Sequence, residues 1–337
     1  MSSGTTLRST GPTTARIVVT SRRFWFVIAA VIIGLLPMIF TDSYWRTNLI
    51  VCAINVLLAI GLDFVLGYAG QLNLGQSAFY GIGAYTSTLL ITLLGVPFWI
   101  SFVAGILLSC IAGVFLSIFA VRLRGHYLAI ASLGFAVITY QILLNWISLT
   151  QGPLGIYAIA PPPPLTIPGL GKIEFSNLEN LFYLVAGFAL LVFIVLDQLV
   201  RSPVGETLTA MREDEISAAS LGINCQLWKV FAFAISSAVA GAAGAFYASF
   251  VGTLVPDAFF ITESFTVLAM VIVGGMGTLI GPVLGAVLLT VLPELLRGIG
   301  DLRLIVYGVS VTLVVIFMPG GIVQAAKRVA SSRGGRG

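Results

Sequence analysis

The stretch GYAGQLNLGQSAFYGIGAY, residues 67–85, lies between two strongly apolar runs and contains five glycines. It also carries the side-chain amides of Gln71, Asn73 and Gln76 and the hydroxyl of Ser77. These groups are neutral hydrogen-bond donors and acceptors, and they could face a polar path. Irregular backbone at membrane depth is tolerated only where it is buried in protein or lines a water-filled cavity. We therefore predict either broken or re-entrant backbone beside a polar path, or a plain cytoplasmic turn.

A second set of neutral polar residues, Tyr140, Gln141 and Asn145, lies within another apolar run. Together with the four polar residues above, this set is the candidate lining of a translocation path. The alternative is that most of these side chains form hydrogen bonds between neighbouring helices. The sequence leaves both interpretations open.

Residues that usually carry catalysis are scarce. His126 is the only histidine, and Cys52, Cys110 and Cys225 are scattered without the spacing of a disulfide or a metal site. The chain contains no G-x-x-x-x-G-K-[ST] phosphate loop, so any ATPase must be another chain. We therefore expect no catalytic residue, no metal and no cofactor here, and a membrane enzyme is the least favoured class.

The composition is that of an integral membrane protein. Of 337 residues, 58% are hydrophobic and 9% are charged, against roughly 25% charged residues in soluble domains. Mean hydropathy is +1.06. The net charge of +4 comes largely from the tails and short loops, so no binding to nucleic acid is expected.

A helix needs about 20 apolar residues to cross the hydrocarbon core of a bilayer. The apolar runs predict an all-α, polytopic membrane protein with about ten transmembrane helices, which form a permease domain over residues 24–320. The predicted spans are 24–40, 48–66, 74–94, 98–121, 127–147, 180–200, 229–251, 262–280, 282–297 and 303–319.

Lysine and arginine set the predicted orientation, because cytoplasmic loops carry an excess of both. Basic residues gather in the tail 1–23, in VRLRGH and in the tail 321–337. With ten spans all three segments fall in the cytoplasm, which places both termini there and makes residues 1–23 a disordered tail. Residues 148–179 then form an external loop, and residues 201–228 a cytoplasmic one.

The cytoplasmic loop 201–228 has the signals of two short helices. Ser202 followed by Pro203 suits a helix start, Asp214 can cap a second helix, and Gly222 is placed to end it. One interpretation is a solvated connection between two spans. The other is a compact docking element through which a motor acts on a membrane protein.

Two sets of small residues repeat at intervals of four, which places each set on one helix face and favours close helix packing. The sets are Gly277, Gly281 and Gly285, and Ala240, Gly244 and Ala248. The glycine-rich regions around 67–85 and 273–286 are only weakly similar to each other as an internal repeat.

Acidic residues are rare within the apolar runs, and none forms an obvious buried relay. Asp63 and Asp197 lie near predicted cytoplasmic ends, and Glu263 and Glu294 near predicted outer ends. Secondary transporters usually need intramembrane acids or broken-helix carbonyl sites. Their scarcity favours an external energy source. In the alternative, an ion-coupled secondary transporter, Asp63 would be the coupling acid.

Five segments in order resemble the M-type membrane permease subunits of the LIV-type branched-chain amino acid ABC importers. The resemblance covers about residues 25–320. The segments are GYAGQLNLGQSAFYGIGAYT, RLRGHYLAIASLGF, LLNWISLTQGP, SPVGETLTAMREDEISAASLGIN and VIVGGMGTLIGPVLGA.

The resemblance implies a machine of several chains in the bacterial cytoplasmic (inner) membrane. It implies the ten-helix, type II fold of the vitamin B12 permeases. The implied partners are the lipid bilayer, a similar second permease that completes a heterodimer, two cytoplasmic ATPases that use the ATP, and an extracytoplasmic substrate-binding protein. It also implies an ATPase-coupling role for the cytoplasmic loop. The residues concerned are Arg201, Arg212, Glu213, Asp214, Glu215 and Gly222.

Three positions depart from the pattern of the family. Gln76 stands where the family often has histidine, and Tyr140 and Gln141 stand where an acidic–basic pair is common. LTQGPLG replaces LTGGPNG. The implied substrate is a branched-chain amino acid, with urea, short amides or other amino acids as the alternative.

Overall fold

The computed structural model describes residues 31–120 apart from 32, 38 and 41, residues 125–167 and 171–299, and ten isolated or clustered positions between 305 and 325. The chain divides into two units, Met1–Asp42 and Ser43–Gly337, and the description below concerns the second. Parts of the predicted spans 24–40 and 303–319 and most of both predicted tails lie outside the described residues.

Eight helices among the described residues are long and apolar enough to cross a membrane. They coincide with the eight central predicted spans, so an all-α polytopic membrane protein is confirmed in outline. The total of ten and the type II fold stay predictions. The bounds are α2 (Ser43–Asp63) with the π-helical turn η1 (Phe64–Tyr68), α3 (Gln76–Leu94), α4 (Phe98–Ala120), α5 (His126–Asn145), α7 (Leu178–Val200), α10 (Cys225–Val251), η3 (Pro256–Phe259) with α11 (Ile261–Gly274), and α12 (Ile280–Leu295) with η4 (Leu296–Ile299).

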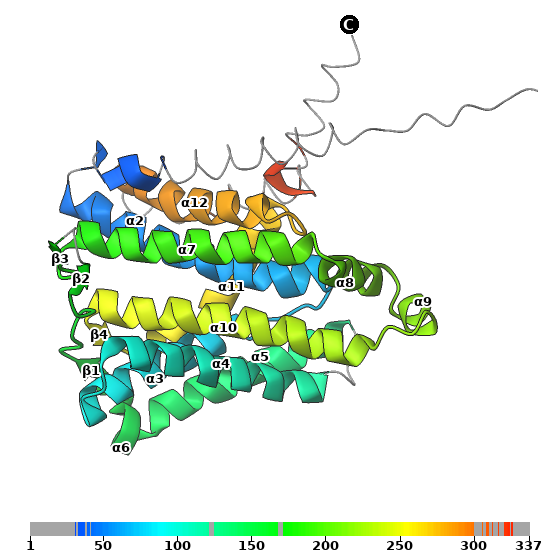
Figure 1. The fold of residues 1–337 in the computed structure, drawn as a ribbon, viewed down its shortest axis with the longest axis horizontal. Coiled ribbons are helices and arrows are strands. Elements are labelled where there is room, and N and C mark those ends of the chain that lie inside the picture. The colour runs from blue at the N-terminus through cyan, green and yellow to red at the C-terminus, as the bar shows by residue number, and fades with distance from the viewer. Residues whose placement is uncertain are drawn as a thin grey trace, which may run out of the picture. The chain divides into compact units, whose positions relative to one another are not determined.

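Short elements lie at the two ends of the bundle (Figure 1). One end carries α6 (Ile147–Thr150), η2 (Gly152–Leu154), β1 (Ile156–Tyr157), β2 (Leu165–Ile167), β3 (Gly171–Ile173) and β4 (Thr253–Leu254). The other end carries α8 (Pro203–Glu213) and α9 (Glu215–Ser220). The antiparallel pairs β1–β4 and β2–β3 were not predicted, because two- and three-residue strands leave no alternating pattern in the sequence.

The helix α10 packs against α3 and α4 in the middle of the bundle (Figure 1). Ala240, Gly244 and Ala248 are all buried on it. A Cβ atom on Gly244 would overlap the carbonyl oxygen of Tyr80 in α3. The missing side chain therefore lets two helix backbones approach closely, as small residues do in membranes.

The pair α11 and α12 approaches in the same way. A Cβ atom on Gly281 would overlap the carbonyl oxygen of Gly275, and one on Gly285 would overlap that of Met270. Gly277 is different, because it lies in the turn between the two helices at φ +73°, a conformation that favours glycine. The structure thus places Gly281 and Gly285 at a helix contact and Gly277 beside it.

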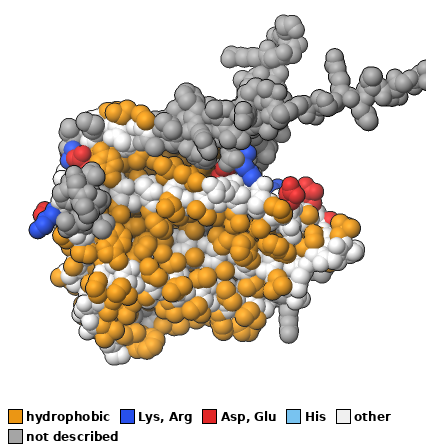
Figure 2. All heavy atoms as spheres, in the orientation of Figure 1, with side chains coloured by type: hydrophobic (Ala, Val, Ile, Leu, Met, Phe, Trp, Pro, Cys, Tyr) orange, Lys and Arg blue, Asp and Glu red, His pale blue; other side chains and the backbone are white. Residues whose placement is uncertain are grey.

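Apolar side chains cover most of the visible face of the bundle, and charged ones lie toward its ends (Figure 2). On α4 alone, large aliphatic and aromatic side chains are exposed at Ile100, Val103, Leu107, Ile111, Phe115 and Ile118. A soluble protein does not expose contiguous apolar area on this scale. This exposed apolar surface is the one expected of helices that face lipid or another membrane subunit.

Candidate functional site

The helices α8 and α9 form where the loop signals predicted them. The Ser202 Oγ atom accepts a hydrogen bond from the Val204 N–H at 3.2 Å, and Pro203 occupies the first turn of α8. Asp214 ends α8 and caps α9, because its Oδ1 atom accepts from the Ile216 N–H at 2.9 Å. Gly222, at φ +87°, lies in the turn that follows α9.

Three of the four charges predicted as a docking face are engaged within the chain. The Glu215 Oε1 atom lies 2.8 Å from Nζ of Lys229, whose side chain is 4% exposed, so it ties α9 to α10. Asp214 is used as the cap, and Arg212 donates a hydrogen bond to the carbonyl oxygen of Gly67. Glu213 is exposed. Arg212 and Asp214 are exposed as well, so these internal contacts leave the docking interpretation open.

Arg201, the first residue of the predicted coupling set, also has a partner inside the chain. Its Nε atom lies 2.9 Å from the Asp197 Oδ1 atom, one helical turn earlier at the end of α7. The outward surface of α9 is instead partly apolar, since Ile216 is 67% exposed and Leu221 is 82% exposed. Exposed aliphatic residues next to Glu213 give this end the mixed surface of a protein contact.

The Asp214 carboxylate gives α9 a pH-dependent cap. The hydroxyl of Ser217, and then the N–H groups of Ser217 and Ile216, hold the pKa of Asp214 below its usual range. A lowered pKa means that the cap stabilises α9 at neutral pH and is lost as the pH falls through the pKa of the folded state.

We expect acidification to increase amide hydrogen exchange at Ile216 and Ser217, after correction for the intrinsic effect of pH. Asp214→Asn should remove this pH dependence, because an amide oxygen still accepts the bonds and does not titrate. Leu227 is the internal control, since its N–H is capped at 3.3 Å by the neutral Asn224. Equal pH responses at Leu227 and Ile216 would contradict the assignment.

The amide-rich stretch 69–75 is non-helical backbone between η1 and α3, and its polar side chains are largely buried. Asn73 is fully buried and donates to Gln76 Oε1 at 3.3 Å. Gln76 in turn donates to the Leu58 carbonyl oxygen at 3.3 Å and accepts from Ser236 Oγ at 3.3 Å. This non-helical backbone fits both a broken helix and a plain turn, so the two alternatives stay open. Asn73 bonds locally, whereas Gln76 bonds to two distant segments of the chain.

The remaining members of that set also have partners within the chain. Ser77 is 1% exposed, and its N–H and hydroxyl oxygen are both 2.9 Å from Oγ of Ser264 in α11. Gln71 is half-buried and donates to the Ala69 carbonyl oxygen at 3.2 Å. In this chain, therefore, the alternative of interhelix hydrogen bonding describes Gln76 and Ser77.

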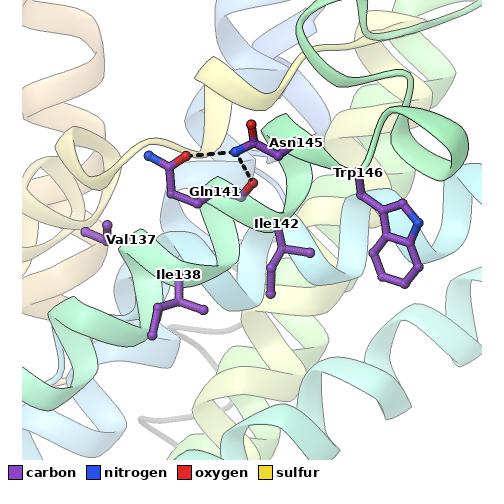
Figure 3. A pocket seen from close by; sticks show the side chains of 6 residues that line it. All are labelled: Val137, Ile138, Gln141, Ile142, Asn145 and Trp146. Carbon is purple, nitrogen blue, oxygen red and sulfur yellow. Dashed lines mark hydrogen bonds between the residues drawn. The ribbon is translucent and has the colours of Figure 1, made fainter.

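The other polar set lies on the exposed side of α5 (Figure 3). The Asn145 Nδ2 atom donates to Gln141 Oε1 at 3.0 Å and to the Gln141 carbonyl oxygen at 2.8 Å. Both side chains are exposed. Tyr140 points elsewhere and donates to Asp257 Oδ1 in η3 at 2.8 Å.

Gln141 and Asn145 form part of a shallow, open depression along α5. Apolar side chains make up the rest of its lining, which comprises Val137, Ile138, Gln141, Ile142, Asn145 and Trp146 (Figure 3). The internal amide bond leaves Gln141 Nε2 as a donor and Asn145 Oδ1 as an acceptor, neither with a partner among the described residues. We name Gln141 and Asn145 the amide pair.

A hydrogen bond connects the non-helical stretch 69–75 to α5, the helix that carries the second polar set. The Leu74 N–H donates to Ser132 Oγ, on α5, at 2.9 Å. Sequence analysis missed Ser132, Ser236, Ser264 and Lys229, because a lone serine or lysine carries no motif. It also missed the structural role of Asp63, although an acid four residues before Gly67 in an apolar run is a usable signal.

No group of three histidine, cysteine, aspartate or glutamate side chains in the described part of the chain could hold a metal ion. The described geometry offers helix caps, side-chain amides and close helix contacts.

Comparison with known proteins assigns the family. The model of the family described as "Branched-chain amino acid transport system / permease component" matches residues 46–318. The high-affinity branched-chain amino acid transport system permease protein LivM of Escherichia coli (strain K12) is 38% identical over 294 residues, which cover 81% of this chain and 68% of that protein. No solved structure matches.

Two further relatives are more distant. The permease protein LivH of Salmonella typhimurium, from the same kind of system, is 25% identical over 281 residues, which cover 79% of this chain and 90% of that protein. The permease protein BraD of Pseudomonas aeruginosa is 28% identical over 294 residues with the same two shares. These matches confirm the resemblance given by the five segments, and the chain belongs to the family of permease components of branched-chain amino acid transport systems.

Proposed function

We propose that this chain is a permease subunit of an ATP-driven importer and forms part of the translocation path for branched-chain amino acids. The observation that carries the proposal is the α8–α9 element, a capped pair of short helices with exposed Ile216 and Leu221. Such a rigid, partly apolar projection suits docking to a motor protein. The relatives, which are named for branched-chain amino acid transport, support the substrate class.

The proposed assembly has four kinds of chain in and on the bacterial cytoplasmic membrane. A second permease completes the path, two cytoplasmic ATPases bind ATP and contact α8–α9, and an extracytoplasmic protein delivers the substrate. Similarity to both LivM and LivH supports the pairing of two permeases. In this orientation both termini lie in the cytoplasm, on the side of α8–α9, and this chain needs no cofactor of its own.

The proposed path runs along the amide pair of α5. An unsatisfied polar group costs several kcal/mol in lipid, so these exposed amides need water or protein beside them. The free donor on Gln141 and acceptor on Asn145 match the carboxylate and ammonium groups of an amino acid. Ile138 and Ile142 flank them and suit an aliphatic side chain.

The experiment is ATP-dependent uptake of radiolabelled leucine in proteoliposomes that hold the full complex. We expect Ile216→Asp to lower uptake at least about tenfold, because an interface anchor contributes about 2 kcal/mol. Ile216→Leu, which keeps an aliphatic contact, should retain uptake. ATP turnover without leucine movement would redirect the search to urea, amides and other amino acids, and uptake without an ATPase would refute the importer.

A further inference from the structure

The side chain of Arg212, in the last turn of α8, lies against the backbone of glycine residues from two other segments of the chain. Its Nη1 atom donates to the carbonyl oxygen of Gly67, 145 residues earlier in η1. A Cβ atom on Gly70, at φ +67°, would lie 2.8 Å from Cγ of Arg212, and one on Gly277 would lie 2.8 Å from its Nη1 atom. Gly70 and Gly277, from two distant segments, thus leave space for one arginine, and Gly67 supplies the carbonyl oxygen that it binds.

A buried carboxylate holds these two segments together. Asp63 is fully buried, and its Oδ1 atom accepts a hydrogen bond from the Gly277 N–H at 2.8 Å. A Cβ atom on Gly67 would overlap this carboxylate and the Gly277 nitrogen. Arg212 is close enough to attract the Asp63 carboxylate electrostatically. We call Asp63, Gly67, Gly70 and Gly277 the arginine socket.

The arginine socket connects α8 to the two least regular places in its neighbouring spans. One is the π-helical turn η1 and the non-helical residues 69–75, and the other is the turn between α11 and α12. π-Helical turns are frequent at functional sites. From residues 69–75, the Leu74 N–H reaches Ser132 on α5, the helix that carries the amide pair.

The other charged contacts of this end hold α9 and α7 instead. Glu215 and Lys229 tie α9 to α10, whereas Arg201 and Asp197 are one turn apart on the same helical segment. Arg212 therefore differs from both, because it reaches the junctions of four membrane-spanning helices, α2, α3, α11 and α12, from α8.

We infer that Arg212 is a positioning residue that transmits movement of α8 through the arginine socket to the α2–α3 break and the α11–α12 turn. Packed side chains and hydrogen bonds that join two sites can carry coupling of this kind. The inference rests on the proposed function, since it presumes that a motor displaces α8. It predicts that loss of the contact separates ATP turnover from transport.

The test compares leucine uptake with ATP hydrolysis in proteoliposomes of the full complex. Arg212→Met keeps the length of the side chain and removes its donors and charge. We expect uptake per ATP to fall about tenfold, which is a typical coupling effect, while ATP hydrolysis continues. Arg212→Lys keeps a positive donor without the planar fork and should recover part of the ratio.

The matched control is Arg46→Met. Arg46 is a half-buried arginine on α2 that lies 3.3 Å from Glu179 of α7, at the opposite end of the helix from the arginine socket. Its loss should leave uptake per ATP unchanged. An unchanged ratio in Arg212→Met, or an equal fall in Arg46→Met, would overturn the inference.

Two further results separate a failure of the inference from a variant that does not assemble and from a failure of the proposed function. If Arg212→Met does not assemble, Arg212→Lys decides, because a ratio equal to that of the wild type would show that the planar fork in the arginine socket is not needed and would overturn the inference. If the wild-type complex itself shows no ATP-dependent uptake, the proposed function fails, and the inference fails with it.

Discussion

Replacing Gln141 and Asn145 together with leucine is expected to lower leucine uptake about 100-fold while the complex still assembles. Each amide is proposed to bond a charged group of the substrate, and such a hydrogen bond contributes about 1.5 kcal/mol at the low end of its range. Two of them give about 3 kcal/mol, and each 1.4 kcal/mol is a factor of about ten. The loss should appear in the initial rate of uptake at subsaturating leucine.

Asn55→Leu is the control for this experiment. Asn55 also uses a side-chain amide within a span, since its Nδ2 atom donates to Thr290 Oγ1 on α12 at 2.9 Å. Removing that bond should weaken a helix contact and leave the concentration dependence of uptake unchanged. Wild-type uptake by the double leucine variant would show that the amide pair does not line the path.

Gly244→Ala is expected to destabilise the bundle strongly, although it adds only one methyl group. The added Cβ would overlap the Tyr80 carbonyl oxygen and lie 2.8 Å from the Ala84 nitrogen, and neither backbone atom can turn away. The helices α3 and α10 would have to separate. Overpacking of this kind costs about 1–3 kcal/mol of unfolding free energy, occasionally more.

The measurement is thermal unfolding of the purified protein in detergent, beside Gly187→Ala. Gly187 lies in α7, and a Cβ atom there would meet nothing within 4 Å. Since alanine is favoured over glycine inside a helix by about 0.5–1 kcal/mol, Gly187→Ala should raise the unfolding temperature. If both variants shift in the same direction, the close approach at Gly244 is not what holds these helices together.

The helices were predictable because their signals are local. Long apolar runs marked the spans, and Ser202, Pro203 and Asp214 marked the starts of α8 and α9, since a cap acts over three residues. The boundary between the predicted spans 262–280 and 282–297 was less well placed, because α11 ends at Gly274 and α12 begins at Ile280. In that region some glycines form the turn between the two helices, and others let the helices approach closely.

The partners of the polar residues could not be predicted in the same way. Gln76 bonds to Leu58 and Ser236, and Arg212 bonds to Gly67, and each pair joins different elements of the fold. Which side chain turns inward depends on how the helices pack, and no local pattern records that. Sequence analysis therefore treated Gln141 and Gln76 alike, as candidate residues of the translocation path. In the structure Gln141 is exposed and Gln76 is buried.

The antiparallel pair β1–β4 lies at the end of the bundle opposite α8 and α9, and it bears on which residues can vary in this family. Ile156 pairs with Leu254, and the Ile159 N–H donates to the Gly252 carbonyl oxygen at 3.1 Å, so main-chain bonds join the segment after α5 to the segment after α10. Backbone pairing places few demands on side-chain identity. Leu154 and Tyr157 are 74% and 61% exposed there. The exposed side chains of this surface can therefore vary within the family while the β1–β4 pair keeps the two helix ends together.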